Sequence, residues 1–326
     1  MKIITTNLFI IFIMCFACTL QFEPFNYFQN NKAYSYGYSH SLRIFDFDDP
    51  LFPLVLGDVY HFPDNFYDFY YNGDTSYSIS GHQGYEETKL EVLDFTELTQ
   101  PRITTVYKSL DMIQDVELCG DYAYVAGGYS GLYILNVSNP ENPVVENTVD
   151  TASIANEIFI SGNYAYVVAY SGFKIFDISN PIEPILISYF HDYDKTYKII
   201  VVDSLAYVIR QYGHPTHDYY VAIFNIQDPA IPTLVNTIEH PNWVSDIKVV
   251  NNIAYVSYYR NGIGIYDVSN ADSINLLGYY FRRHNGRSID VRFPYIYKAS
   301  TYVGIEIIDV SDPANPFSAH KIDIIN

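Results

Sequence analysis

The chain has 326 residues, of which 49% are hydrophobic and 17% are charged, so it has ample material for a folded core. Its formal net charge is -19, which argues against a nucleic-acid partner and against docking on anionic lipid through a basic patch. A neutral or cationic partner fits this balance better.

The first 18 residues have the pattern of an export signal. Lys2 is followed by an apolar run at residues 8–17, which is shorter than the roughly 18 to 20 residues of a spanning helix. Two processing routes are open, because Ala17 before Cys18 suggests lipidation of Cys18, whereas Cys15 and Phe16 depart from a lipoprotein motif and leave ordinary signal-peptidase cleavage nearby. We expect the chain to be exported to the cell surface, outer membrane or periplasm, with any membrane attachment through a lipid on Cys18.

After a short linker at residues 19–24, residues 25–326 form a repeat array. Seven strand-like segments end in an Asp or Asn anchor, and consecutive anchors are 41 to 48 residues apart. The anchors are Asp46, Asp94, Asn136, Asp177, Asn225, Asp267 and Asp309. Such a period is the mark of a repeat architecture.

Each unit is predicted to contain four short strands, because alternating apolar and polar residues are broken by turn residues at short intervals. In one unit these are strand A at residues 144–149, B at 156–160, C at 164–169 and D at 173–178. Four strands in 40 to 48 residues is the size of one propeller blade. The prediction is an all-β, seven-bladed β-propeller of four-stranded antiparallel blades.

The two ends of the array suggest how the ring closes. The first unit lacks a strand A, whereas residues 317–325 resemble a strand A without a blade. We therefore expect the C-terminal strand to complete the first blade, which would remove open sheet edges.

The strand D segments resemble the LVIVD-repeat family, whose consensus they match at residues 42–46, 90–94, 132–136, 173–177, 221–225, 263–267 and 305–309. Several units also carry the S-N-P or S-D-P turn, as at residues 138–140. This resemblance implies a propeller on secreted or cell-surface proteins, and it supplies no catalytic residue.

The anchors have a structural interpretation, in which each Asp or Asn accepts hydrogen bonds from the next backbone N–H groups. Proline is expected to fix the backbone where the chain crosses to the next blade. No calcium loop motif is present, and no cofactor is expected. With Cys15 and Cys18 removed or lipidated, Cys119 is left without a disulfide partner.

The non-repeating residues gather on one predicted face. Turns D-to-A and B-to-C share one end of the blades, and loops A-to-B and C-to-D share the other, which carries every histidine except His320. The candidate binding residues there are Trp243, His240, His191, His214, His217, Tyr212, Arg282, Arg283, His284 and Arg287. Loops on a rigid scaffold commonly carry sites, although polar residues also favour loops for backbone reasons alone. His214 and His217 are weak metal candidates, since they need further ligands from a neighbouring blade.

Three functions remain open. The leading hypothesis is a non-catalytic binding or scaffold module for a protein or glycan at the cell surface. The first alternative is a polysaccharide hydrolase or lyase, with His240 or His191 as general base and Arg283 holding a uronate. The second is a structural protein of the cell envelope, which predicts an extended apolar or tyrosine-rich outer surface.

Overall fold

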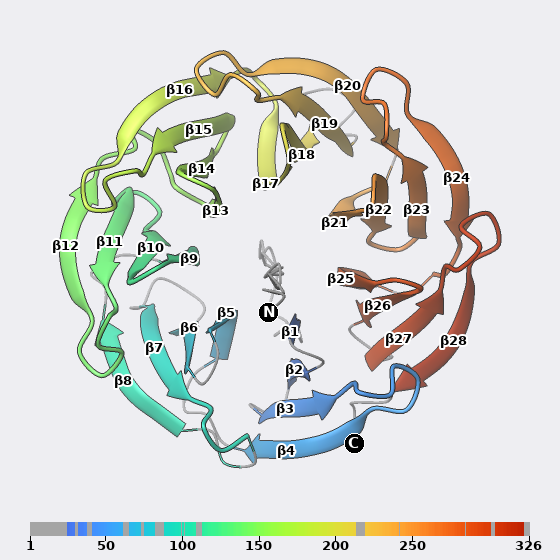
Figure 1. The fold of residues 1–326 in the computed structure, drawn as a ribbon, viewed down its shortest axis with the longest axis horizontal. Coiled ribbons are helices and arrows are strands. Elements are labelled where there is room, and N and C mark those ends of the chain that lie inside the picture. Colours follow the sequence, from blue (N-terminus) through green and yellow to red (C-terminus); the bar gives the residue numbers. More distant parts are fainter. Residues whose placement is uncertain are drawn as a thin grey trace, which may run out of the picture.

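The computed structural model describes residues 25–29, 32–37, 41–60, 65–72, 75–81, 88–98, 100, 102–108, 113–212, 219–240, 242–283, 285–300 and 304–322. The predicted export signal, linker and Cys18 lie outside these residues. All regular structure described is β, in seven four-stranded antiparallel sheets. Figure 1 shows the sheets arranged around a central axis, as expected for a propeller. No helix in the described part of the chain has the length and apolarity to cross a membrane.

The sheets, numbered 1 to 7 in chain order, each contain four consecutive strands. Sheets 1 to 3 comprise β1 Phe25–Gln29, β2 Lys32–Gly37, β3 Ser41–Asp46, β4 Leu54–Tyr60; β5 Asn65–Asn72, β6 Thr75–Gly81, β7 Lys89–Asp94, β8 Arg102–Lys108; β9 Asp115–Cys119, β10 Tyr122–Ala126, β11 Leu132–Asn136, β12 Val144–Val149. Sheets 4 and 5 comprise β13 Glu157–Ser161, β14 Tyr164–Ala169, β15 Gly172–Asp177, β16 Ile185–His191; β17 Lys195–Val202, β18 Leu205–Gln211, β19 Tyr219–Asn225, β20 Thr233–His240. Sheets 6 and 7 comprise β21 Val244–Val250, β22 Ile253–Tyr258, β23 Gly262–Asp267, β24 Asn275–Tyr280; β25 Gly286–Arg292, β26 Tyr295–Ser300, β27 Gly304–Asp309, β28 Phe317–Ile322.

The pairing of the strands corrects the predicted phase of the repeat, that is, which strand begins each blade. Strand A was expected to open its blade, but β12 pairs with β11, the preceding strand D, and Asn136 faces Val144. The proline-containing turn therefore closes a hairpin within one sheet, and the chain crosses to the next sheet only after strand A. The prediction that the C-terminal strand completes the first blade is wrong for the same reason, because β28 pairs with β27 while β4 completes sheet 1.

The anchors confirm their structural interpretation. Asp267 Oδ1 accepts the backbone N–H of Ser269 at 2.9 Å, and Asn270 Oδ1 then accepts that of Asp272 at 3.1 Å. All seven anchors accept the N–H two residues later in this way. These side chains hold the turn in the conformation that returns the chain antiparallel.

Four of these turns also accept a hydrogen bond from the preceding sheet. Thr105 Oγ1 donates to the Glu141 carbonyl at 2.9 Å, and Asn147 Nδ2 donates to the Ile182 carbonyl at 2.7 Å. The same link recurs from Ser188 to Pro229 and from Asn236 to Ala271. The outermost strand of one sheet is thus fastened to the hairpin of the next.

Carboxylates join the innermost strands. Asp115 Oδ2 on β9 accepts the backbone N–H of Ile158 on β13 at 2.8 Å, and Asp246 Oδ2 on β21 accepts that of Ile289 on β25 at 2.9 Å. Asp246 also forms a buried ion pair with Lys198 on β17 at 3.0 Å. Hydrogen bonds to charged groups are stronger than neutral ones, so these contacts hold the inner strands in register.

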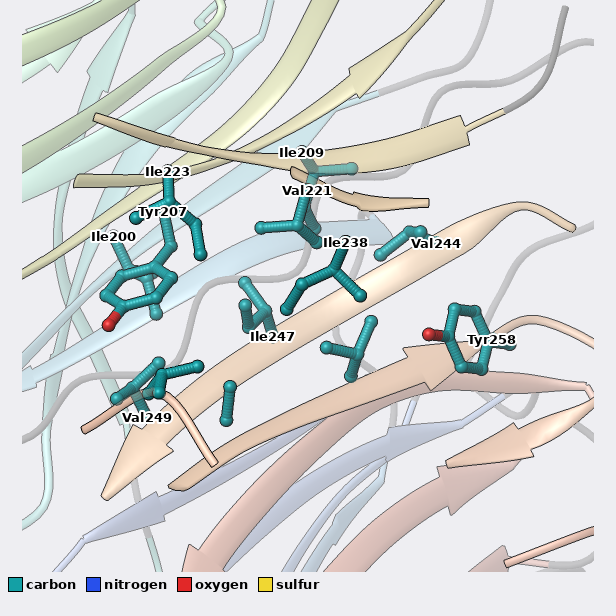
Figure 2. Close-up of a cluster of buried hydrophobic side chains, with 13 residues drawn as sticks. Ile200, Tyr207, Ile209, Val221, Ile223, Ile238, Val244, Ile247, Val249 and Tyr258 are labelled. Atoms are coloured by element: carbon teal, nitrogen blue, oxygen red, sulfur yellow. The ribbon is translucent and has the colours of Figure 1, made fainter. Parts of the chain in front are cut away.

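Apolar side chains fill the spaces between sheets. Between sheets 5 and 6, Ile209 and Val221 lie in one buried cluster with Val244 and Ile247 (Figure 2). Burial of each such side chain contributes about 1.5 to 3 kcal/mol. Sheets 1 and 7 meet in the same manner, because Phe47 packs edge-to-face on Tyr297 with ring centroids 5.1 Å apart.

Candidate functional site

The meander order of the sheets defines two faces. Connections from the first to the second strand and from the third to the fourth lie at one end, which we call the turn face. Connections from the second to the third strand, and crossings to the next sheet, lie at the other end, the loop face. This division agrees with the sorting of loops made from the sequence.

The described candidate residues all lie at the loop face. They are His191 at the end of β16, Tyr212 after β18, His240 at the end of β20, Trp243 before β21, Arg282 and Arg283 after β24, and Arg287 in β25. His214, His217, His284 and Cys18 lie outside the described residues. Among the described residues no three His, Cys, Asp or Glu side chains are grouped to hold a metal ion.

Trp243, Tyr259 and two arginines form a compact group, which we call the Trp243 cluster. The Trp243 and Tyr259 ring centroids are 4.8 Å apart, and the Arg287 guanidinium lies 5.8 Å from the first and 5.1 Å from the second. Arg260 lies 5.5 Å from the Tyr259 ring and donates Nε to Asn285 Oδ1 at 3.2 Å. Stacking on aromatic rings attracts the guanidinium groups and fixes their planes.

The backbone places this cluster where loops from two sheets meet. The Tyr259 N–H donates to the Trp243 carbonyl at 2.9 Å, and the Gly286 N–H donates to the Tyr259 carbonyl at 2.8 Å. Arg287 occupies a β-bulge, since the register shifts between Gly286 and Ser288. Bulges redirect side chains at the ends of strands, and here the bulge carries the residue that stacks on both rings.

Further aromatic rings continue from Trp243 onto sheet 5. Tyr219 stacks against Trp243 with centroids 6.2 Å apart, and Tyr197 lies 5.6 Å from Tyr219. The Tyr197 hydroxyl donates to Gln211 Oε1 at 2.6 Å. Tyr197, Tyr219 and Trp243 are half-buried, so a row of partly accessible rings runs across sheets 5 and 6 at the loop face.

His240 is held by packing. Its ring stacks on Tyr258 with centroids 3.6 Å apart, and its Nδ1 accepts the backbone N–H of Asn242 at 3.1 Å. Burial lowers the pKa of His240, so the neutral ring is favoured. His191 is exposed and meets the edge of Tyr189.

Tyr212 belongs to a second network, centred on the buried Arg210. Arg210 pairs with Asp192 through both terminal nitrogens and also donates to the Asp194 carbonyl at 3.1 Å. Tyr212 stacks on Tyr220 with centroids 4.3 Å apart. The Tyr212 hydroxyl donates to Glu239 Oε1 at 2.9 Å, and Tyr220 donates to Asp194 at 2.7 Å. These contacts stiffen the crossing from β16 to β17.

Arg282 faces the seam between sheets 6 and 7. Its Nε donates to the Tyr280 hydroxyl at 2.9 Å, and that hydroxyl donates to Glu306 Oε1 at 2.7 Å. Lys298 lies opposite Glu306 on the neighbouring strand. Among the described residues its Nζ has no hydrogen-bond partner, and burial lowers its pKa to about 8.

Exposed carboxylates are concentrated at the turn face, although Asp150 and Glu239 are exposed at the loop face. Exposed carboxylates follow the turn face around the sheets, at Asp48, Asp49, Glu97, Asp121, Glu141, Glu183, Asp203, Asp228, Asp272 and Asp312. Two arginines at that face, Arg102 and Arg292, each pair with a carboxylate. The arginines of the Trp243 cluster lie at the opposite end of the strands.

Reasoning from the sequence missed Tyr219, Tyr259, Arg260 and Arg210. Tyr259 and Arg260 directly follow the A-Y-V-like strand of sheet 6, at a position where the other units vary. Arg210 lies one residue before the end of the same strand in sheet 5, and a charged residue there was a signal for a buried ion pair.

A family model described as LVIVD repeat matches residues 112–151, 152–192, 243–281 and 285–323. Each matched range contains one whole sheet, namely sheets 3, 4, 6 and 7. These boundaries agree with the corrected phase of the repeat. No curated protein matches the chain by sequence.

Several solved structures share the fold at low identity. A functionally unknown protein from Desulfotomaculum acetoxidans has a TM-score of 0.68 at 15% identity, covering 91% of this chain and 96% of that chain. The Cps50 (Swd1) beta-propeller domain of Myceliophteria thermophila has a TM-score of 0.65 at 12% identity, covering 89% and 96%. A computationally designed protein, Ika8, has a TM-score of 0.68 at 9% identity, covering 93% and 88%. These likenesses establish the propeller fold alone.

Proposed function

We propose that this LVIVD-repeat protein is a non-catalytic binding or scaffold module that engages a protein or glycan partner through its loop face. The Trp243 cluster carries the proposal, because it places two aromatic rings 4.8 Å apart at a loop junction and each of two guanidinium groups within 6 Å of the Tyr259 ring. Trp, Tyr and Arg are the residues that dominate binding energy at protein interfaces.

The scaffold suits this role. The Trp243 cluster lies on short loops between strands that are held by inter-sheet hydrogen bonds and buried cores. Rigid support lowers the entropy lost on binding. The export pattern around Lys2 and residues 8–17 places the module outside the cytoplasm in this proposal, with Cys18 as the candidate lipid site.

Binding of the purified chain to glycan and peptide arrays tests the proposal. Trp243→Ala and Tyr259→Ala should weaken a specific signal by about thirtyfold or more, as expected for loss of an interface anchor. Tyr193→Ala is the matched control, since this loop-face tyrosine is 95% exposed between β16 and β17. An array signal that survives both cluster variants would contradict the proposal.

The outer strands favour a second candidate, the structural envelope protein. Six of the seven outermost strands present large apolar side chains to solvent near the turn face, and these are Leu54, Val55, Val144, Ile185, Leu186, Leu234, Leu276, Leu277 and Phe317. Such a repeated apolar surface is typical of assembly contacts. Sedimentation velocity should then show concentration-dependent association that Leu276→Ser with Leu277→Ser reduces, and a monomer at all concentrations would contradict this candidate.

The hydrolase or lyase alternative stays a prediction, and no contact among the described residues supports it. The contacts of His240, with Tyr258 and Asn242, are those of a packed ring rather than of a general base aligned by a carboxylate.

A further inference from the structure

We propose that the Trp243 cluster binds a sugar chain bearing carboxylate groups, such as a polyuronate. This inference rests on the proposed function and narrows its ligand. Its basis is that two guanidinium groups lie over the same aromatic ring. Those of Arg260 and Arg287 are 5.5 and 5.1 Å from the centroid of the Tyr259 ring.

The stacked arginines are prepared to receive a planar anion. A guanidinium that lies over an aromatic ring keeps the N–H groups at its edge for hydrogen bonding, and its fork matches a carboxylate bidentately. Arg260 donates Nε to Asn285, which orients the guanidinium and does not use its two terminal nitrogens. Contact with the rings thus orders the two guanidinium groups before an anion binds. Less side-chain entropy is then lost on binding.

Most exposed carboxylates among the described residues lie far from this place, although the net charge of the chain is -19. The exposed carboxylates of the turn face lie at the far ends of β21 and β25, each of 7 residues. That length corresponds to about 23 Å of strand, which exceeds the screening length of about 8 Å at physiological ionic strength. At the loop face, Asp192 pairs with Arg210, while Asp194 and Glu239 accept tyrosine hydroxyls of sheet 5.

The row of rings favours a sugar over an acidic peptide. From the Trp243 cluster it continues through Tyr219 to Tyr197, which adds half-buried aromatic surface beside the arginines. A pyranose presents an apolar ring face with hydroxyls at its rim, so neighbouring sugar units can stack while their carboxylates reach the arginines. A peptide that adds to a strand edge relies instead on main-chain hydrogen bonds.

Calorimetric titration of the full chain with a galacturonate hexamer tests the inference. The fully methyl-esterified hexamer is the uncharged control, and hexaglutamate is the peptide control. The galacturonate hexamer should bind at least about tenfold more tightly than its ester, because the ester cannot form the charge-assisted bonds. Arg260→Gln and Arg287→Gln should each weaken binding by about tenfold. Arg102→Gln removes an equal charge at the turn face and should leave binding unchanged.

The outcomes separate this inference from the proposed function. If the ester bound as tightly as the galacturonate hexamer and Trp243→Ala removed this binding, the proposal of an anionic ligand would be overturned. The loop-face site would still stand. Binding of hexaglutamate alone would overturn the sugar. Failure of all three probes, together with array signals that Trp243→Ala leaves unchanged, would overturn both the ligand class and the proposed function.

Discussion

Asn147 on β12 donates its side-chain N–H to the carbonyl oxygen of Ile182 in the next sheet at 2.7 Å. The Ile182 carbonyl lies in the turn that follows anchor Asp177, so the anchor shapes a turn that the preceding sheet then binds. The repeated S-N-P segment therefore has two tasks, which are to close its own hairpin and to accept a hydrogen bond from its neighbour.

Asn147→Ala should lower the free energy of unfolding by about 1 to 2 kcal/mol, because the partly buried Ile182 carbonyl loses its donor. Urea unfolding followed by circular dichroism measures this. Asn142→Ala is the matched control, since Asn142 is exposed in the turn that precedes β12 and should change stability by less than about 0.5 kcal/mol. Equal effects of the two variants would show that the inter-sheet bond contributes nothing.

Much of the fold follows from the sequence because each unit repeats the same local physics. The alternation of apolar residues, the anchors and the turn prolines predict seven four-stranded units and the sorting of loops into two faces. The phase of the repeat was not predictable in this way. The sequence of a proline-containing turn between strands D and A is compatible both with a hairpin and with a crossing to another blade. Only the pairing of Asn136 with Val144 shows that the turn closes a hairpin.

The candidate site was predictable only in part, for a related reason. Trp243 and Arg287 stand out as rare residue types in loops. Their partners Tyr219 and Tyr259 are two among 34 tyrosines, and nothing periodic connects the three loops that bring these rings together. Their contact depends on the curvature of neighbouring sheets, which local patterns do not encode.

Asp246→Asn should lower the free energy of unfolding by about 3 to 5 kcal/mol, because it leaves the Lys198 ammonium buried without its ion-pair partner. Adding Lys198→Met should recover part of this loss, since it removes the buried ammonium that Asp246→Asn leaves without this partner. A double-mutant cycle from chemical unfolding gives the coupling between the two side chains. Additive losses would show that the 3.0 Å contact does not couple them.

Gly278→Ala should destabilise the protein by about 1 to 3 kcal/mol through overpacking. Gly278 occupies the position on β24 that corresponds to Asn147 on β12, and an added methyl group would overlap the Pro313 carbonyl of sheet 7. Thermal unfolding measures the change. Thr105→Ala at the corresponding position of sheet 2 removes a hydrogen bond without a clash, so its effect should be smaller, and a larger one would contradict the steric argument.

The buried Lys298 gives a pH dependence with a defined sign. Burial lowers its pKa from 10.5 to about 8 in the folded protein, with Glu306, Arg282 and Lys321 as the charged groups of the same seam. Between pH 8 and 10.5 the unfolded chain therefore binds more protons at this residue than the folded one, and stability rises with pH. Below pH 8 both states are protonated and the contribution is constant.

Lys298→Met isolates this contribution, because it keeps the apolar stem and removes the amine. The stability of the unsubstituted protein relative to this variant should rise by about 3 kcal/mol from pH 8 to 10.5. Urea unfolding of both proteins across that pH range measures the difference in stability. The difference cancels the titration of the tyrosines and of Lys248. Burial also lowers the pKa of Lys248 to about 8. Since Val256 and Val208 occupy the corresponding positions of sheets 6 and 5, the variant should fold and be more stable at pH 7. A difference that stays flat across the range would mean that Lys298 titrates alike in the folded and unfolded states.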